Sequence, residues 1–172
     1  MRLRGVVYRA HNPRWAFTPT SGEGAARHGG RFNPPAMPAL YTSLRMETAW
    51  LEAQQGFPFK AQPLTICGYD VDCTDVTDLA DQAVCQELAV SPADLACPWE
   101  DLASRGHPPA SWGLTRRLFG QGIAAIIVPS FAPGATAIDK NVVFWRWPGV
   151  LPYRVVVIDD EARLPRDDGS WR

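Results

Sequence analysis

The sequence has no excess of charge of either sign and no long apolar run, and each absence excludes a class of protein. Its 172 residues carry 17 Lys and Arg against 18 Asp and Glu, so the formal net charge is -1. General affinity for nucleic acid or for anionic lipid needs a basic stripe, and none is present. The first residues, MRLRGVVYRAHNPRW, lack the apolar centre of a signal peptide, and no apolar run approaches the roughly 18 residues that span a bilayer. We therefore expect a cytoplasmic protein with no direct nucleic-acid binding and no membrane association.

Closely spaced cysteines and short catalytic motifs are missing too. The four cysteines, Cys67, Cys73, Cys85 and Cys97, form no C-x-x-C pair, whereas zinc sites in proteins usually contain tight ligand pairs. We therefore expect reduced, buried thiols and no metal. No glycine-rich segment fits G-x-G-x-x-G or a Walker loop, and GxSxG and HExxH are absent. Any function must be argued from residues that are far apart in the sequence.

The apolar residues that are present suffice for the core of one domain. The hydrophobic fraction is 46%, and the chain length lies within the usual size of a single domain. Runs of β-branched residues predict strands, and apolar residues at 3.6-residue spacing predict helices. The predicted strands are 3–9, 39–43, 64–73, 123–130, 141–147 and 153–160, and the predicted helices are 44–55, 78–89, 91–104 and 111–122. We interpret residues 1–172 as one α+β domain in which the polar residues 160–172 form a loosely held tail.

A long irregular passage, from His11 to Ala39, precedes the first substantial helix. Unstructured passages of this length are uncommon in a small domain and tend to be functional. Within it, Arg31 directly follows Gly29 and Gly30, and prolines stand at positions 34, 35 and 38. Glycines let a ligand approach the backbone closely, and a guanidinium can bind a phosphate or carboxylate through two parallel hydrogen bonds. The alternative is a surface salt bridge, which the position of Arg31 alone favours.

The predicted helix 44–55 carries two glutamates, and either of them suits a cleft. Its apolar stripe comprises Met46, Ala49, Trp50 and Ala53, and its expected N-cap is Ser43. At 100° per residue, Glu47 and Glu52 lie about 140° apart, on opposite flanks of this stripe. One cleft can hardly use both, and either can be an ordinary solvated residue. The helical pattern leaves the choice open.

Three further side chains stand where ligand-binding groups are common. Tyr41 ends an apolar run, so its ring is either part of the core or a stacking surface with a polar hydroxyl. Ser130 follows a nearly all-apolar strand at the point where the chain leaves the predicted sheet, and Asn141 opens the next strand. Strand ends often carry ligand-facing groups, although a serine or asparagine there is more often a turn or capping residue.

In order along the chain, several segments resemble the RES domain, a family named for its arginine, glutamate and serine. The matching segments span nearly the whole chain: YRA (8–10), SGEGAARHGGRFNPP (21–35), PALYTS (38–43), ETAWLEA (47–53), IIVPSFAPGA (126–135) and NVVFWRW (141–147). No single segment is decisive, but the set is specific. By position, the resemblance assigns the arginine, tyrosine, glutamate and serine of the family to Arg31, Tyr41, Glu52 and Ser130. It thereby selects Glu52 over Glu47.

The resemblance also implies a fold and an activity. The fold is similar to that of ADP-ribosyltransferase toxins, with a mixed central β-sheet and flanking helices. The activity is that of a toxin from a bacterial toxin–antitoxin pair, which consumes NAD+ as a co-substrate and passes ADP-ribose to a protein, to phosphate or to water. The implied partner is an antitoxin with an Xre-type helix-turn-helix domain that covers the active site.

On this hypothesis each residue has a role in breaking the nicotinamide–ribose bond. The leaving group is neutral and the transition state resembles an oxocarbenium ion, so that one carboxylate can suffice. Glu52 stabilises the developing positive charge, and Arg31, on a loop of flexible glycines and stiff prolines, binds the diphosphate. Tyr41 stacks near nicotinamide, Ser130 hydrogen-bonds ribose or phosphate, and Asn141 supports Ser130.

Two other classes of function compete with this hypothesis. A nucleosidase or glycosidase needs a second carboxylate beside Glu52, for which Asp139 is the candidate. A non-catalytic module that binds a nucleotide or a protein needs no carboxylate pair. Release of nicotinamide from NAD+ distinguishes the three.

Overall fold

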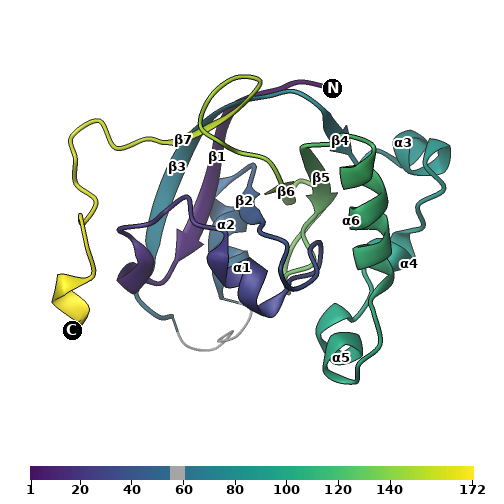
Figure 1. The fold of residues 1–172 in the computed structure, drawn as a ribbon, viewed down its shortest axis with the longest axis horizontal. Helices are drawn as coiled ribbons and strands as arrows, with labels where there is room; N and C mark the ends of the chain where they lie inside the picture. Colours follow the sequence, from purple (N-terminus) through teal and green to yellow (C-terminus); the bar gives the residue numbers. More distant parts are fainter. Residues whose placement is uncertain (55–60) are drawn as a thin grey trace.

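The fold is built on one mixed sheet of seven strands, seen in a computed structural model that describes residues 1–54 and 61–172 (Figure 1). The strands are β1 (Leu3–His11), β2 (Leu40–Ser43), β3 (Thr65–Cys73), β4 (Val76–Asp78), β5 (Ala125–Pro129), β6 (Lys140–Phe144) and β7 (Tyr153–Val157). Their order in the sheet is β4-β5-β6-β2-β1-β3-β7, and every pair is antiparallel except β4 with β5. The predicted α+β architecture with a mixed central sheet is confirmed.

The helices are short, and several differ from the prediction. They are α1 (Glu23–His28), α2 (Met46–Ala53), α3 (Gln82–Glu87), α4 (Pro92–Leu95), α5 (Trp99–Ser104) and α6 (Ala110–Gly120), with 3-10 turns η1 (Pro13–Trp15) and η2 (Gly169–Trp171). The predicted helix 91–104 is two helices, because Pro98 has no N–H to donate and disfavours helical backbone in the residue before it. The predicted helix 78–89 starts late, after β4. The predicted helix 111–122 corresponds to α6, and the passage from His11 to Ala39 contains η1 and α1.

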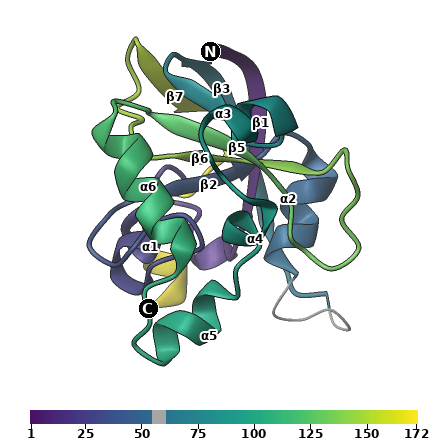
Figure 2. The ribbon, with the colours of Figure 1, turned by 90° about the vertical axis from the view of Figure 1, so that its right-hand side faces the viewer.

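Both faces of the sheet are covered by apolar residues, which alternate along the strands. Ile126 and Val128 of β5 pack with Leu114 and Leu118 of α6, while Ile127, between them, belongs to a second core cluster. That second cluster joins residues from distant strands of the sheet, such as Tyr69 of β3 and Phe144 of β6. This cluster therefore extends across the sheet from β3 to β6. Figures 1 and 2 show α6 and α2 on either side of the central strands β2 and β6.

Helix α2 is oriented by a polar contact rather than by the apolar stripe that the sequence suggested. Met46 and Trp50, two members of that stripe, are 49% and 38% exposed, so the predicted core role is wrong for both. The buried residues are Thr48 and Ala49, and the Thr48 hydroxyl donates to the buried carboxylate of Asp139 across 2.6 Å. Burying Thr48 against its partner turns the larger apolar side chains outward.

The start of α2 also differs from the prediction. The N-cap position is occupied by Arg45, and no side chain forms a capping hydrogen bond there. Ser43, the expected cap, is the last residue of β2. The predicted end of the helix, residue 55, lies outside the described residues, and α2 ends at Ala53.

The sheet is nearly divided between β1 and β2. These strands share a single registered pair, Tyr8 with Ser43, whereas β1 pairs with β3 along its entire length from Leu3 to His11. Continuing antiparallel pairing would place Arg9 opposite Thr42, but the ladder stops after Tyr8. The two strands therefore diverge from Arg9 onward and leave a gap in the middle of the sheet, close to α2.

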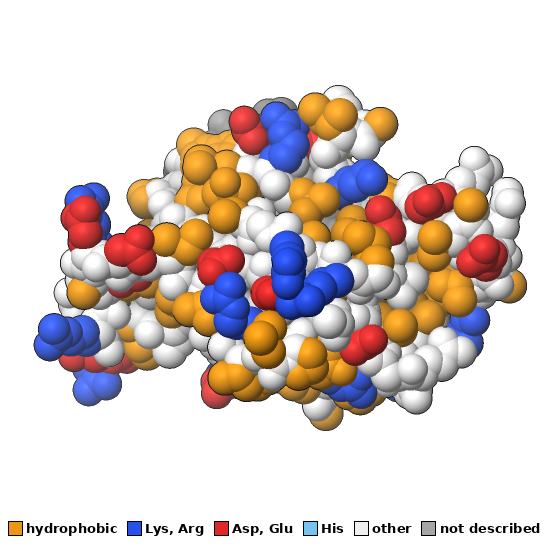
Figure 3. Space-filling model, turned by 90° about the horizontal axis from the view of Figure 1, so that it is seen from above, with side chains coloured by type: hydrophobic (Ala, Val, Ile, Leu, Met, Phe, Trp, Pro, Cys, Tyr) orange, Lys and Arg blue, Asp and Glu red, His pale blue; other side chains and the backbone are white. Residues whose placement is uncertain are grey.

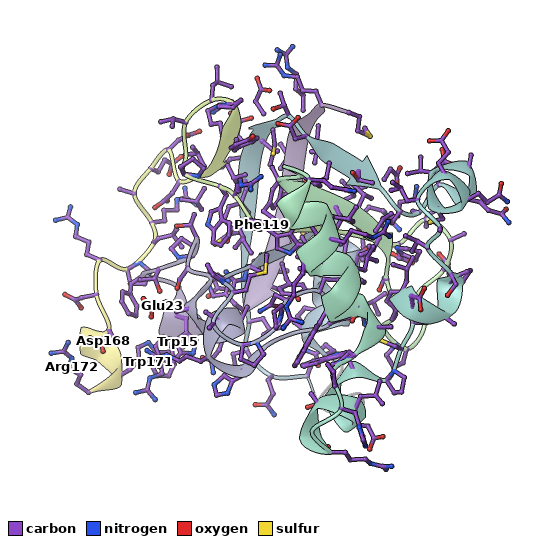
Figure 4. The ribbon with its side chains drawn as sticks, turned by 45° about the vertical axis from the view of Figure 1, so that its right-hand side comes forward. Trp15, Glu23, Phe119, Asp168, Trp171 and Arg172 are labelled. Carbon is purple, nitrogen blue, oxygen red and sulfur yellow. The ribbon has the colours of Figure 1, made fainter. Side chains whose placement is uncertain are left out.

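The surface and the C-terminal segment complete the fold. On the face shown in Figure 3, acidic and basic side chains are intermingled with apolar ones, without an extended patch of one sign. The C-terminal η2 lies near η1: Figure 4 shows Trp171 close to Trp15, and Arg14 contributes to lowering the pKa of Asp168, after the larger effect of its hydrogen bond from Arg172. Among the described residues, no helix is long and apolar enough to cross a bilayer.

Candidate active site

Two cavities with shared lining residues lie beside the point where β1 and β2 part. The main cavity, about 460 Å³, is lined by Arg31 and Phe32 of the glycine loop, Trp99 of α5, and Val128 and Phe131 around the end of β5. The second, about 260 Å³, is lined by Tyr8, Ala10, Thr42 and Ser43, the residues at which the strands part; we call it the split cavity. Both are lined by Arg9, Tyr41, Glu52 and Asn141. The structure thus brings Arg31, Tyr41, Glu52 and Asn141 together around one hollow.

Glu52 is the acidic residue of this hollow, and two donors fix its carboxylate. The Ser130 hydroxyl donates to Oε1 of Glu52 across 2.6 Å, and Nδ2 of Asn141 donates to the same oxygen across 2.5 Å. Hydrogen bonds to an ionised carboxylate are stronger and more directional than neutral ones, so the orientation of this side chain is set before any ligand binds. Ser130 was expected to bind ribose or phosphate and Asn141 to support Ser130; in the structure both donate to Glu52.

The strand register explains why these groups meet. Asn141 of β6 pairs with Ser43 of β2 on one side and with Val128 of β5 on the other. One residue from each of these three neighbouring strands therefore lies at the same level of the sheet. Ser130 follows two residues after Val128, where β5 has ended, and its backbone N–H still bonds the carbonyl of Asp139. The Ser43 hydroxyl donates to Oδ1 of Asn141 across 2.7 Å, which leaves the amide nitrogen facing Glu52.

Arg31 is anchored along one edge of its guanidinium. Nη1 donates to the carbonyls of Cys97 at 2.6 Å and Leu95 at 3.3 Å, and the group lies over the ring of Phe131 at 4.6 Å from its centroid. Among the described residues it forms no salt bridge, so the surface ion pair favoured by its position is not observed. Partial burial lowers the pKa of Arg31. The result is a fixed cation in the wall of the main cavity.

The loop that carries Arg31 is held mainly by hydrogen bonds. Asn33 is fully buried, and its amide nitrogen donates to the carbonyls of Ala25, Pro34 and Met37. The Tyr41 hydroxyl donates to Oδ1 of Asn33 across 2.7 Å and accepts a bond from the N–H of Phe32. Burial raises the pKa of Tyr41. The hydroxyl of Tyr41 therefore holds the loop, and its ring lines both cavities.

Two tryptophans and a threonine complete the support of the loop. The carbonyl of Gly30 accepts a bond from the Trp112 indole N–H, and the carbonyl of Phe32 accepts from Trp145 and from the Thr115 hydroxyl. Sequence reasoning attributed the stiffness of this loop to its prolines and missed Asn33, Trp112 and Trp145. No local signal reveals such contacts, because Trp112 and Trp145 are 82 and 113 residues from their partners.

The other acidic candidates lie outside the cavities. Glu47 has a 70% exposed side chain and pairs with Arg45 at 3.5 Å. Asp139 is buried, and hydrogen bonds from Thr48 and from the backbone and hydroxyl of Thr136 lower its pKa. Its oxygens are thus occupied in fastening α2 to the segment after β5, and it lines neither cavity. Asp139 therefore does not provide a second carboxylate beside Glu52.

Sequence reasoning gave Arg9 no role, yet it lines both cavities. It lies in YRA, a segment noted for its resemblance to the RES domain, which was the signal that could have identified it. Within the described residues, no group of three or more His, Cys, Asp or Glu side chains is arranged to hold a metal ion. All four cysteines are buried and free, as predicted for thiols.

The fold is similar to that of a protein of known structure. The chain resembles a chain of the crystal structure of the Mycobacterium tuberculosis MbcT–MbcA toxin–antitoxin complex with a TM-score of 0.62, covering 92% of this chain and 84% of that one. The identity in this comparison is 18%, so the likeness concerns the fold. The model of the RES domain matches residues 6–167, and the chain belongs to the RES domain family.

Curated relatives match a shorter part of the chain. The NAD(+) phosphorylases MbcT of Mycobacterium tuberculosis (strain H37Rv) and of Mycobacterium bovis are each 41% identical to it over 64 residues. This alignment covers 35% of this chain and 34% of each relative. The chain thus aligns with about a third of the length of these relatives.

Proposed function

We propose that this protein cleaves the nicotinamide–ribose bond of NAD+ and transfers ADP-ribose to an acceptor, as the toxin of a toxin–antitoxin pair. The observation that carries the proposal is the Glu52 carboxylate, fixed by Ser130 and Asn141 in the wall of a cavity that also presents Arg31. Membership of the RES domain family and the similarity to NAD(+) phosphorylases support it. The latter favours inorganic phosphate as the acceptor, ahead of water or a target protein.

Cleavage of the nicotinamide–ribose bond requires one negative charge close to the ribose. As the glycosidic bond breaks, its electron pair passes to the ring nitrogen of nicotinamide, which leaves neutral, and positive charge develops on the ribose. A carboxylate held in place before the reaction stabilises that charge without having to reorganise. Because Oε1 of Glu52 already accepts two hydrogen bonds, the side chain is held in one orientation toward the cavities.

The binding of NAD+ is assigned to the other side chains of the main cavity. A volume of about 460 Å³ lies in the range of sites for small ligands and cofactors. Arg31 offers the diphosphate a cation whose Nη1 edge is already bound to backbone carbonyls, so little ordering remains to be done on binding. The ring of Tyr41 lines both cavities, where it can stack on nicotinamide.

The partner in this proposal is an antitoxin with an Xre-type helix-turn-helix domain that covers the cavity. An enzyme that depletes cytoplasmic NAD+ harms its own cell, so a cognate inhibitor must accompany it. The match to a toxin–antitoxin complex supports a partner of this kind. Expression of the protein alone should arrest growth, co-expression of the antitoxin should restore it, and Glu52→Gln should be harmless at the same level of protein. Normal growth with abundant active protein would contradict a toxin role.

The enzymatic test is direct. Purified protein is incubated with NAD+, and nicotinamide release is followed by chromatography, with Glu52→Gln as the matched control. Release by the wild-type protein alone supports the proposal. Analysis of the second product identifies the acceptor as phosphate, water or protein. Binding of NAD+ without release would instead indicate a non-catalytic module.

A further inference from the structure

Arg9 lies where three cavities meet. Besides the main and split cavities, it lines a third hollow of about 580 Å³, which we call the side cavity. The side cavity is formed by η1, the segment after it and α1, and its wall includes Trp15, Phe17 and Arg27. It shares Arg9 and Gly24 with the main cavity. Arg9 is therefore approachable from a side that does not pass Arg31.

The position of Arg9 follows from the parting of β1 and β2. Tyr8 makes the single registered pair with Ser43, and Arg9 is the next residue along β1, at the mouth of the gap. Nη1 of Arg9 donates to the carbonyls of Pro19 and Ser21, each at 3.0 Å. The guanidinium is thus fixed by backbone groups, as that of Arg31 is fixed by the carbonyls of Leu95 and Cys97.

Arg9 shares cavity walls with two carboxylates, Glu52 in the main and split cavities and Glu23 in the side cavity. Across residues 1–54 and 61–172, the salt bridges of the structure do not include Arg9, although the group is half-buried. Removing a cation from water without a counter-charge is unfavourable, and a bound anion offsets that loss. An arginine that is held at one edge, and that enters no salt bridge among the described residues, is well suited to bind a small oxyanion.

The two arginines differ in their relation to Glu52. Arg31 shares only the main cavity with Glu52, whereas Arg9 shares both the main and the split cavity with it. A reaction between NAD+ and phosphate has two anionic reactants, the diphosphate of the dinucleotide and the attacking phosphate, and needs a cationic site for each. The structure offers two anchored guanidinium groups at different places around one carboxylate.

We propose that Arg9 binds inorganic phosphate, the acceptor of ADP-ribose, and positions it for attack on the ribose; this rests on the proposed function. A phosphate oxygen forms a bond to C1′ of the nicotinamide ribose as the bond to nicotinamide breaks, and the bonding pair leaves with nicotinamide. The products are neutral nicotinamide and ADP-ribose 1″-phosphate, and the proton of hydrogen phosphate stays on the new ester or passes to solvent. Phosphate can reach Arg9 through the side cavity while the dinucleotide occupies the main one.

The test measures nicotinamide release against phosphate concentration at saturating NAD+, and against NAD+ at saturating phosphate. For the wild-type protein we expect saturable stimulation by phosphate and ADP-ribose 1″-phosphate as the product, detected by 31P NMR. Arg9→Gln should raise the KM for phosphate about tenfold or more, the loss expected for a charge-assisted contact, with the KM for NAD+ changed less than about threefold. Arg9→Lys should restore part of the phosphate affinity.

The matched control is Arg14→Gln, which removes an arginine on η1 that lines none of the three cavities. It should leave both KM values unchanged. If Arg9→Gln is unstable, two other measurements replace it. The KM for phosphate of Arg9→Lys should lie above that of the wild-type protein, and phosphate should raise the melting temperature of the wild-type protein.

Three results separate the hypotheses. A parallel rise of the KM for NAD+, with a normal phosphate response, would make Arg9 a dinucleotide ligand and overturn the inference. Release of nicotinamide that is independent of phosphate would overturn it as well, while leaving NAD+ cleavage intact. Absence of release under all conditions would reject the proposed function itself.

Discussion

Nδ2 of Asn141 donates a hydrogen bond to Oε1 of Glu52 across 2.5 Å, although the two residues are 89 positions apart. The amide is oriented in turn by the Ser43 hydroxyl, which donates to Oδ1 of Asn141 across 2.7 Å. A short relay of side chains thus runs from the buried end of β2, through the start of β6, to the carboxylate on α2.

This relay predicts a graded series of losses. Asn141→Ala removes one donor to a charged group, and kcat for nicotinamide release should fall about 10- to 100-fold. Asn141→Asp should lose more, because it places a second carboxylate against Glu52. Ser43→Ala only frees the amide to turn and should cost less than either. Steady-state kinetics of the three variants check the order, and equal activity of Asn141→Asp and wild type would contradict it.

The two glutamates of α2 should behave differently. Glu52→Gln keeps the size of the side chain but removes the charge, and NAD+ turnover should fall by about 10² or more, as when an electrostatic stabiliser is lost. Glu47→Gln is the matched control, since Glu47 is exposed and pairs only with Arg45 in the described structure. Its turnover should stay within about twofold of wild type. Equal losses in both variants would show that the site is misassigned.

Replacing Arg31 should affect binding more than chemistry. The diphosphate does not react, so its contact stabilises ground state and transition state alike, and losing it raises KM with little change in kcat. For Arg31→Ala we expect a loss of about 2 kcal/mol or more in NAD+ binding, and Arg31→Lys should recover only part of it. Measurements of KM, kcat and melting temperature for both variants check this prediction. Unchanged NAD+ affinity in a folded Arg31→Ala protein would remove the loop from the site.

Gly30 should not tolerate even one added carbon. A Cβ at this position would lie 2.5 Å from the Tyr41 hydroxyl oxygen and 2.7 Å from Oδ1 of Asn33, so the contacts that hold the loop would have to move. Gly30→Ala should destabilise the protein by about 1–3 kcal/mol, the usual range for overpacking, and weaken NAD+ binding. The control is Gly113→Ala in α6, where a Cβ meets nothing within 4 Å and helix propensity favours alanine. Chemical denaturation measures both.

The stability of the fold should depend on His11 in mildly acidic solution. Both ring nitrogens are buried without a hydrogen-bond partner among the described residues, and burial, followed by the charge of Arg9, lowers the pKa of His11 to about 4. The unfolded chain binds the proton near pH 6.5, whereas the folded chain binds it only near pH 4. The folded state therefore loses stability as the pH falls from about 6.5 to about 4, and not above that window.

Thermal melts across this window check the effect of His11. His11→Gln, which does not titrate, should show a flatter decline of melting temperature between pH 6.5 and 4 than the wild-type protein. Acid lability that remains in this variant below about pH 4 is expected from carboxylates such as Asp139, whose hydrogen bonds lower its pKa. Identical slopes in the two proteins would contradict the assignment.

The strands were largely predictable from sequence because their apolar runs are local. The runs at 64–73 and 123–130 correspond to β3 and β5, and the run at 141–147 corresponds to β6 but extends too far. The ladder stops at Phe144, after which Trp145 and Trp147 turn their indole N–H groups to the carbonyls of Phe32 and Thr20. An apolar run marks burial, and burial continues here after strand pairing has ended.

The site was predictable only in part, because its geometry depends on contacts that no local pattern contains. The helical pattern could not choose between Glu47 and Glu52, and the resemblance to the RES domain was needed to select Glu52. What distinguishes Glu52 in the structure is its contact with Ser130 and Asn141, 78 and 89 residues further along the chain. The apolar stripe of α2 gave a wrong prediction of its buried face for the same reason. The contact that buries Thr48 is with Asp139, 91 residues further along the chain.

The order of these residues along the chain has a consequence during synthesis. Arg31, Tyr41 and Glu52 leave the ribosome early, but the donors that fix the carboxylate come from residues 130 and 141. A nascent chain that ends before Asn141 also lacks β6, the strand that pairs with both β2 and β5. Such a chain contains Glu52 but lacks Asn141, one of the residues that orient its carboxylate. If the proposed function is right, the protein becomes active only after residue 141 has been made, which gives a proposed antitoxin synthesised at the same time an opportunity to bind first.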